Sequence, residues 1–417
     1  MIKLKTLNSG IKLVMENIPY LQSVAMGVWV KAGAVDENAE HAGISHFIEH
    51  MMFKGTEKRS AKQIAEDIDR IGGQINAFTG KEATCYYVKA VKSNYHKAAD
   101  VIFDMLENSL FDQKEMDRER KVICEEIKMN MDSPDDLAHD TITTMVFNQG
   151  SLGNSILGTP ETLNTINHDV MAEHVRKQYT KDSIVISVCG NYDEDELCNY
   201  FNDKLDSLIA EKPARKTKKA EYRPAFKCIT KDIEQTHICL ATKGIPTMDP
   251  SYFAFGILNN VMGGSMSSRF FQNVREEKGL AYSVYSMAGT FTEDGYFNIY
   301  AGISHDKIQE AVDAIREELS KLAKTGITKE ELESSREQLK AAYVFGQENV
   351  AGRMFKNGKN VLLNNTIIEP EEVISSFDRV TMDDIEEVKH LICNPETYSG
   401  VVVTKNEVDM EKIMTGR

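Results

Sequence analysis

The segment HAGISHFIEHMMFKGT, residues 41–56, carries the most informative pattern in the chain. Its apolar spacing predicts a helix over residues 44–53, and on a helix the side chains of His46 and His50 project from one face. Two imidazoles on one face can bind a single Zn²⁺ ion, and Glu49 beside them can take a proton from a metal-bound water. The pattern predicts a zinc site with a general base; histidines that contact only core or solvent are the alternative.

A catalytic zinc site has three protein ligands, so one more ligand should come from elsewhere in the chain. The stretch EMDRERKVICEEIKMNM, residues 115–131, predicts a helix on which Glu119 and Glu126 are seven residues, or two turns, apart. The two carboxylates then share a face, so a ligand and its supporting group could lie on one stripe. The predicted core side of this helix consists of Val122, Ile123 and Ile127. Because glutamate on a helix usually faces solvent, spacing alone leaves the role of Glu126 open.

The order of predicted elements occurs twice along the chain. The first half has strands at 10–18 and 23–34, helices at 44–53 and 61–71, strands at 74–78 and 84–90, helices from 96 to about 131, and a closing strand at 183–190. The second half has a strand at 236–245, helices at 252–262 and 267–277, strands at 283–292 and 295–303, helices from 305 to about 344, and a closing strand at 399–405. The repetition predicts an α+β fold of two similar domains, each a mostly antiparallel sheet flanked by helices, related by duplication.

A composition break separates the two halves. The run KPARKTKK, residues 212–219, has five basic residues and no acidic one, which is typical of a solvated connection. We therefore predict an N-terminal domain at 1–207, a linker at 208–224 and a C-terminal domain at 225–417. The length of 417 residues agrees with at least two domains.

Composition excludes several classes of protein. The net charge of −15 disfavours a nucleic-acid binder, because phosphate contacts require a basic surface. No apolar run is long enough to cross a membrane, and the N-terminus, MIKLKTLNSG, lacks the pattern of a signal peptide. Seven cysteines without a CxxC pair indicate reduced thiols. We expect a cytoplasmic protein that binds neither nucleic acid nor membrane.

These segments resemble the inverted-motif (HxxEH) zinc metallopeptidases, the family of pitrilysin, insulin-degrading enzyme and mitochondrial processing peptidase. The likeness spans nearly the whole chain, through residues 7–19, 41–56, 72–90, 119–127 and 275–286. Size and the single duplicated pair of domains are most similar to the short bacterial processing-peptidase-like branch. That resemblance implies a bacterial cytoplasmic protein and a homodimer, with a heterodimer as the alternative.

The resemblance also implies roles for the residues in the first half. His46, His50 and Glu126 would bind one Zn²⁺ per chain, and Glu49 would be the general base. Glu119 would be a second catalytic carboxylate that supports the site by hydrogen bonding. The strand residues Asn76, Ala77, Phe78 and Thr79 match the edge that binds an extended peptide substrate.

The second half has no HxxEH segment, so no second zinc is expected. It contains Arg275 and Tyr282, which match the Arg/Tyr pair that contacts the bound peptide in the family. Both side chains can donate to a carbonyl oxygen as it becomes an oxyanion.

Taken as a member of this family, the chain is expected to be a zinc-dependent endopeptidase that cleaves unfolded or short peptides inside a closed chamber. The two halves would then close over the peptide about the linker. One alternative is a noncatalytic scaffold or partner subunit of the same fold. Another is a zinc hydrolase with a nonpeptide substrate.

Overall fold

The computed structural model describes residues 1–202, 204–205, 215 and 217–416. The chain divides into two compact units, each assembled from three segments. Unit 1 consists of Met1–Ile127, Asn154–Thr217 and Val344–Pro370, and unit 2 of Lys128–Gly153, Lys218–Tyr343 and Glu371–Arg417. Of the predicted linker at 208–224, residues 208–214 and 216 lie outside the described part of the chain.

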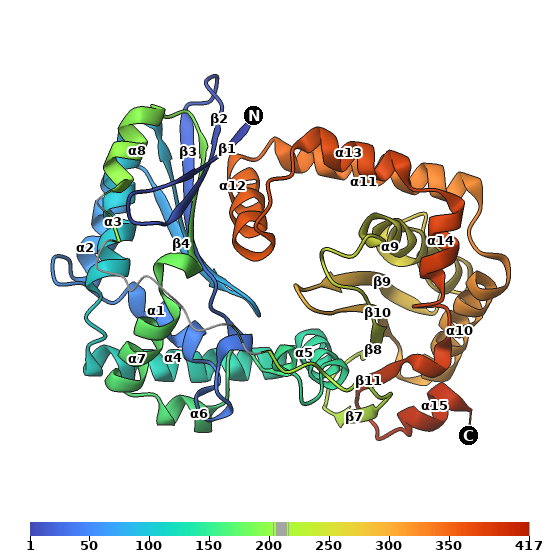
Figure 1. The fold of residues 1–417 in the computed structure, drawn as a ribbon. Helices are drawn as coiled ribbons and strands as arrows, with labels where there is room; N and C mark the ends of the chain where they lie inside the picture. The colour runs from blue at the N-terminus through green and yellow to red at the C-terminus, as the bar shows by residue number, and fades with distance from the viewer. Residues whose placement is uncertain (203, 206–214, 216, 417) are drawn as a thin grey trace. The chain divides into compact units, whose positions relative to one another are not determined.

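Unit 1 contains a six-stranded mixed sheet in the order β1-β2-β6-β3-β5-β4. Figure 1 labels β1, β2, β3 and β4 of this sheet. Its strands are β1 (Ile2–Thr6), β2 (Lys12–Asn17), β3 (Ser23–Val30), β4 (Gln74–Thr79), β5 (Thr84–Val91) and β6 (Ile184–Gly190). Only the β2–β6 pair is parallel among these pairings. Strand β4 therefore forms one edge of the sheet.

Helices cover both faces of this sheet. Unit 1 also contains short 3₁₀ and π turns. The α-helices are α1 (Ile44–Met52), α2 (Ala61–Arg70), α3 (Tyr95–Asn108), α4 (Gln113–Asp132), α6 (Pro160–Thr165), α7 (His168–Gln178), α8 (Glu194–Asn202) and α12 (Val350–Lys359). The short turns are η1 (Ala34–Asp36), η2 (Ala39–His41), η3 (Lys92–Asn94), η5 (Lys181–Ser183) and η9 (Asn360–Asn364). The last residues of α4 belong to unit 2.

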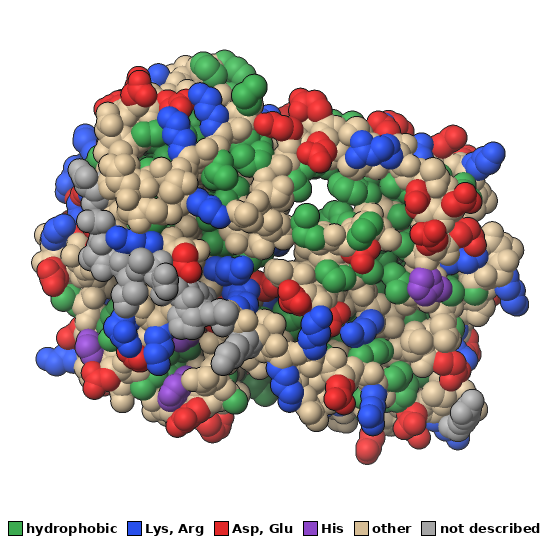
Figure 2. Space-filling model, viewed as in Figure 1, with side chains coloured by type: hydrophobic (Ala, Val, Ile, Leu, Met, Phe, Trp, Pro, Cys, Tyr) green, Lys and Arg blue, Asp and Glu red, His purple; other side chains and the backbone are tan. Residues whose placement is uncertain are grey.

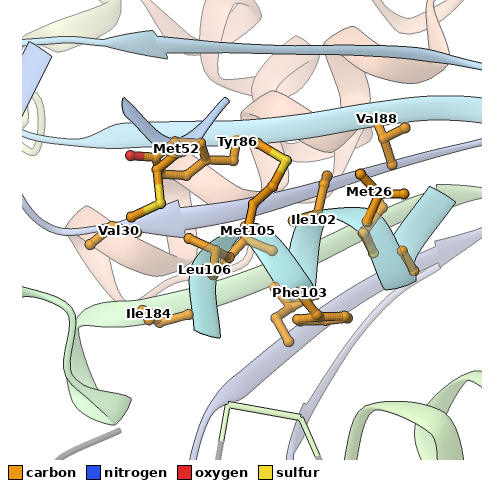
Figure 3. Packing of buried hydrophobic residues seen from close by; sticks show 14 of the residues in the cluster. Met26, Val30, Met52, Tyr86, Val88, Ile102, Phe103, Met105, Leu106 and Ile184 are labelled. Atoms are coloured by element: carbon orange, nitrogen blue, oxygen red, sulfur yellow. The ribbon is translucent and has the colours of Figure 1, made fainter. Parts of the chain in front are cut away.

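Alternation along β3 divides the buried side chains of unit 1 between the two faces. Val24, Met26, Val28 and Val30 belong to the main cluster with α1 and α3, part of which Figure 3 shows. Ala25 and Trp29 belong to smaller clusters on the opposite face. There α12 packs against β3 and β6. The sheet is thus buried on both sides.

Unit 2 repeats this arrangement with five strands in the order β7-β11-β8-β10-β9. The strands are β7 (Phe226–Thr230), β8 (Thr236–Lys243), β9 (Ala281–Thr290), β10 (Gly295–Ile303) and β11 (Ser399–Thr404), and only β7–β11 is a parallel pair among them. The order corresponds to β2-β6-β3-β5-β4 of unit 1, with the parallel pair in the same place. The predicted α+β fold of two similar, mostly antiparallel domains is confirmed.

The helices of unit 2 lie on both faces of its sheet. The α-helices are α5 (Pro134–Val146), α9 (Tyr252–Asn259), α10 (Ile308–Thr325), α11 (Lys329–Gln347), α13 (Pro370–Arg379), α14 (Met382–Lys389) and α15 (Met410–Thr415). The short turns are η4 (Ser151–Gly153), η6 (Asn260–Gly264), η7 (Phe271–Glu277), η8 (His305–Lys307) and η10 (Pro395–Thr397). Helix α5 packs against β8 and β11.

The two halves of the chain exchange one helix each. Helix α5 comes from the first half of the sequence but covers a face of the sheet in unit 2. Helix α12 comes from the second half but covers a face of the sheet in unit 1. Each unit therefore takes part of its core from the other half of the chain.

The described helices are all too short or too polar to cross a lipid bilayer. Figure 2 shows acidic and basic side chains interspersed over the face in view. The net charge of −15 is thus not gathered into one continuous acidic patch on that face.

Candidate metal centre

Helix α1 presents its two histidines on one side and an apolar stripe on the other. The stripe consists of Phe47, Ile48, Met51 and Met52, each 1% exposed or less and packed in the main cluster of unit 1. His46 is 8% exposed, and the side chain of His50 is 22% exposed. Burial of the stripe fixes the rotation of the helix, so both imidazoles point the same way.

The two histidines meet Glu126 of helix α4. Oε2 of Glu126 lies 3.7 Å from Nε2 of His46 and 3.6 Å from Nε2 of His50. One ligand atom from each of the three residues falls within 4.8 Å of the others. Donors of a tetrahedral zinc ion with bonds of about 2.0–2.1 Å are separated by about 3.3 Å, so small adjustments would complete such a site.

The chemistry of the donors also fits a cation. In the described part of the chain, Oε2 of Glu126 is buried and has no hydrogen-bond partner. Burial, with a smaller contribution from His50, lowers the pKa of His46 to about 4, so its imidazole is neutral near pH 7. Neutral imidazole is the form that binds metals. The three residues therefore suit Zn²⁺ by donor type and separation, and His46 also by its protonation state.

Glu119 supports the histidine pair from the same helix as Glu126. Its Oε2 lies 3.1 Å from Nδ1 of His50, and its Oε1 lies 2.7 Å from Nζ of Lys54. Glu119 is only 6% exposed. A proton on Nδ1 that is donated to Glu119 leaves the Nε2 lone pair of His50 directed at Glu126. Glu119 thus lies where it can set the tautomer of His50.

Glu49 has a different partner. The hydroxyl of Thr79 donates a 2.5 Å hydrogen bond to Oε2 of Glu49. Burial raises the pKa of the Glu49 carboxyl, while the Thr79 hydroxyl and the nearby His50 oppose that rise. The carboxyl is therefore held next to the histidine pair in a partly dry environment, as a general base requires.

Thr79 is the last residue of β4, the strand with the other predicted substrate-binding residues. Along β4, exposed positions alternate with partly buried ones: Asn76 is exposed, and Ala77 packs against the main cluster. Phe78 is 39% exposed, with its ring centroid 5.5 Å from that of Trp29. Within the described residues β4 pairs with β5 alone, so its other side can accept another strand.

Arg275 and Tyr282 belong to unit 2 and lie together there. The Arg275 guanidinium carbon is 5.6 Å from the centroid of the Tyr282 ring and 4.7 Å from that of Phe271. Tyr282 is the second residue of strand β9 and is 76% exposed. The structure thus groups His46, Glu49, His50, Glu119, Glu126 and Thr79 in unit 1, and Arg275 with Tyr282 in unit 2.

Lys54 is a further member of this centre that was not predicted from the sequence. It follows His50 by four residues, just beyond the end of α1. The four-residue spacing of a helix does not extend to this position, so no local signal in the sequence indicated Lys54.

The fold and the donor set together define the class of HxxEH metallopeptidase-like proteins. The profile described as "Insulinase (Peptidase family M16)" matches residues 12–160, and that described as "Peptidase M16 inactive domain" matches residues 165–339. The chain belongs to peptidase family M16.

Similar proteins support this assignment. The "Uncharacterized zinc protease YmxG" of Bacillus subtilis is 43% identical over 385 residues, which cover 92% of this chain and 94% of that protein. Two solved structures share the fold. One is a peptidase M16 inactive domain from Pseudomonas fluorescens, with a TM-score of 0.91, 18% identity, and coverage of 98% of this chain and 99% of that one. The other, a protease from Helicobacter pylori, has a TM-score of 0.88, 19% identity, and coverage of 97% and 99%.

Proposed function

We propose that this chain is a zinc-dependent endopeptidase that cleaves unfolded or short peptides inside a closed chamber. The observation that carries the proposal is the convergence of His46, His50 and Glu126 with the carboxyl of Glu49 beside them. The family and the zinc-protease relatives agree with this activity. One zinc ion per chain is proposed, bound by the three converging donors.

A zinc ion held there would polarise the scissile carbonyl and lower the pKa of a water to about 7. Glu49 removes a proton from the attacking water and returns it to the leaving amine. Thr79 keeps the Glu49 carboxyl oriented through its hydroxyl. Glu119 keeps His50 in one tautomer.

The substrate is proposed to bind as an extended strand along β4. Main-chain hydrogen bonds would hold it there beside Asn76, Ala77 and Phe78, so many peptide sequences could be accepted. Because Thr79 closes this strand and contacts Glu49, a peptide that lies along β4 is led toward the general base. A folded protein has no free strand to offer and should be resistant.

We further propose that Arg275 and Tyr282 of the C-terminal domain, 225–417, act on a peptide held by the N-terminal domain, 1–207. Both would donate to the oxyanion that develops on the scissile carbonyl. The exposed Tyr282 ring and its Arg275 neighbour leave donor groups accessible to a substrate. We also propose a homodimer in the bacterial cytoplasm, which sedimentation analysis and fractionation would test.

The decisive experiment combines metal analysis with peptide hydrolysis. Wild type should contain about one zinc per chain and cleave an unstructured fluorogenic peptide, and a chelator should stop cleavage. Glu49→Gln should keep the zinc and lose hydrolysis, whereas Glu126→Gln should lose the metal. Glu125→Gln changes the exposed neighbour of Glu126 and serves as the matched control with normal metal and activity. Full activity in Glu49→Gln would refute the proposed role.

The competing proposal is a noncatalytic scaffold or partner subunit. The inactive-domain profile that matches residues 165–339 favours it, and the Pseudomonas protein of the same fold is likewise described as an inactive domain. That profile, however, lies outside the HxxEH segment at residues 46–50. A scaffold would show no chelator-sensitive cleavage of any peptide in a broad panel.

A further inference from the structure

A buried carboxylate outside the HxxEH segment holds the start of helix α1. Glu37 lies in the loop between η1 and η2 and is 9% exposed. Its Oε2 accepts a 2.7 Å hydrogen bond from the backbone N–H of Gly43, and its Oε1 accepts a 2.9 Å bond from the N–H of Ser45. Both carboxylate oxygens are thus used on the first turn of one helix.

Helix α1 cannot supply this cap itself. Its N-cap is Gly43, which has no side chain and adopts a left-handed conformation with φ of +91°. An added Cβ at Gly43 would lie 2.6 Å from the carbonyl oxygen of Leu157 and 2.9 Å from Cα of Gly158, so a capping Ser or Asp would not fit. The free amides at the helix start therefore require an acceptor from elsewhere, and a carboxylate there also interacts favourably with the helix dipole.

The loop that carries Glu37 is itself fixed. The guanidinium of Arg215 donates to both carboxylate oxygens of Asp36, at 2.9 and 2.7 Å, and Gly33 donates its N–H to Oδ2 of the same residue. After Glu37, the hydroxyl of Thr162 donates a 2.7 Å bond to the carbonyl of Ala42. The loop is therefore held on both sides of Glu37, so this carboxylate can fix the position of the start of α1.

The held turn is the one that carries the first metal donor. Ser45 directly precedes His46, and the Gly43 carbonyl accepts the N–H of Phe47 on the far side of His46. Within a helix, a small rotation at the start displaces both His46 and His50, since they lie on one face. Glu126 comes from another helix and would not follow that movement.

We propose that Glu37 is a positioning residue for the metal centre. By binding the amides of Gly43 and Ser45 it fixes the start and rotation of α1, so that the two imidazoles converge on Glu126. The inference rests on the proposed function, because it assumes that the three donors bind a metal.

The test compares Glu37→Gln with a matched buried carboxylate in unit 1. Asp104 is 2% exposed and accepts bonds from Thr56, Arg59 and Asn108, none of which lies in α1. In Glu37→Gln one oxygen becomes an NH₂ group that faces a backbone N–H, so one cap bond is lost. We expect its zinc dissociation constant, measured by chelator competition, to rise about tenfold to a hundredfold. Asp104→Asn should keep the wild-type zinc affinity, even if this variant unfolds at a lower temperature than the wild type.

Two further measurements separate positioning from general destabilisation. The visible spectrum of the Co²⁺-substituted protein reports ligand geometry and should change in Glu37→Gln but not in Asp104→Asn. In the metal-free proteins, hydrogen exchange of the Gly43 and Ser45 amides should be faster in Glu37→Gln alone. Should Glu37→Gln fail to fold, the shorter Glu37→Asp, which keeps the charge, should show a smaller change of the same kind.

The outcomes distinguish the two proposals. A wild type that binds neither Zn²⁺ nor Co²⁺ overturns the proposed function, and the role of Glu37 with it. A wild type that binds zinc and cleaves peptide, with Glu37→Gln equal to it in zinc affinity and cobalt spectrum, overturns the positioning role alone. Equal losses of zinc affinity in Glu37→Gln and Asp104→Asn would also overturn it.

Discussion

Three glutamates lie near the histidine pair, and each of them has different neighbours. Glu119 is buried and bonded to His50 and Lys54, so its charge is already compensated. Glu49 is oriented by a hydroxyl, which leaves it able to accept a proton. Glu126 presents an oxygen that no other described group bonds. Under the proposed function, the same type of side chain would serve as support, base or ligand according to its neighbours.

The hydroxyl of Thr79 should matter for turnover and not for metal content. Hydrogen bonds to charged groups contribute about 1.5–3 kcal/mol, so Thr79→Val should lower kcat about tenfold or more. Steady-state kinetics and zinc analysis of the same preparation would check this. Thr79→Ser retains the hydroxyl and should be close to wild type. A Thr79→Val enzyme with normal kcat would show that the bond does not orient Glu49 during the reaction.

Asp104 should contribute stability that depends on pH. Burial alone raises the pKa of its carboxyl, but hydrogen bonds from Thr56, Arg59 and Asn108 outweigh burial, and the pKa lies below the ordinary value of 3.8. Because the folded-state pKa is the lower one, this stabilisation is complete above about pH 4 and is lost as the pH falls further. Asp104→Asn should reduce the free energy of unfolding by about 3 kcal/mol. Urea denaturation should give equal differences at pH 7 and 5 and a smaller one below pH 4.

At the scale of elements, sequence periodicity predicts helices and strands well where one face is buried. The helix predicted at 44–53 is found as α1, and the strands predicted at 74–78 and 84–90 are found as β4 and β5. One prediction on α4 is wrong: Val122 is 49% exposed, because the buried stripe runs through Met116, Ile123 and Ile127. Spacing alone does not determine whether a residue at the border of an apolar stripe is buried or exposed.

The packing of α4 against α1 could not be predicted in the same way. Seven-residue spacing places Glu119 and Glu126 on one face, but which of them meets the histidines depends on how the two helices pack. Glu126 was predicted as a ligand from the resemblance to a family, because no local physical signal distinguishes it from Glu119. The capping role of Glu37 was equally hidden, since it joins a loop to a helix six residues later.

The contact of α12 with the sheet of unit 1 depends on two glycines. A Cβ at Gly358 would lie 2.2 Å from Nε1 of Trp29, which is part of a rigid ring, whereas a Cβ at Gly27 would meet the movable thioether of Met354 at 2.5 Å. Gly358→Ala should therefore destabilise by about 1–3 kcal/mol and Gly27→Ala by less. Gly256 of α9 has open space around it, so Gly256→Ala should stabilise by about 0.5–1 kcal/mol. Denaturant titration of the three variants measures their free energies of unfolding. A Gly27→Ala variant less stable than Gly358→Ala would contradict this prediction.

At the scale of the whole molecule, the proposed reaction draws on residues from both units. Tyr282→Phe removes one proposed oxyanion donor, so kcat should fall about a hundredfold while zinc content stays unchanged. The control is Tyr20→Phe, which alters an equally exposed tyrosine, 78% against 76%, in unit 1. Peptide kinetics that do not distinguish Tyr282→Phe from Tyr20→Phe would remove Tyr282 from the mechanism.

The reciprocal placement of α5 and α12 has a consequence for the origin of this chain. Each follows the long helix pair of its own half, α3–α4 or α10–α11, so the two occupy the same place in the repeated order. Such symmetry is what a domain-swapped pair of identical ancestral polypeptides would leave behind after their genes fused end to end. In the present chain, each half relies on the other half for a helix that covers one face of its sheet. Residues 1–207 produced alone should aggregate, and co-production with the second half should restore solubility.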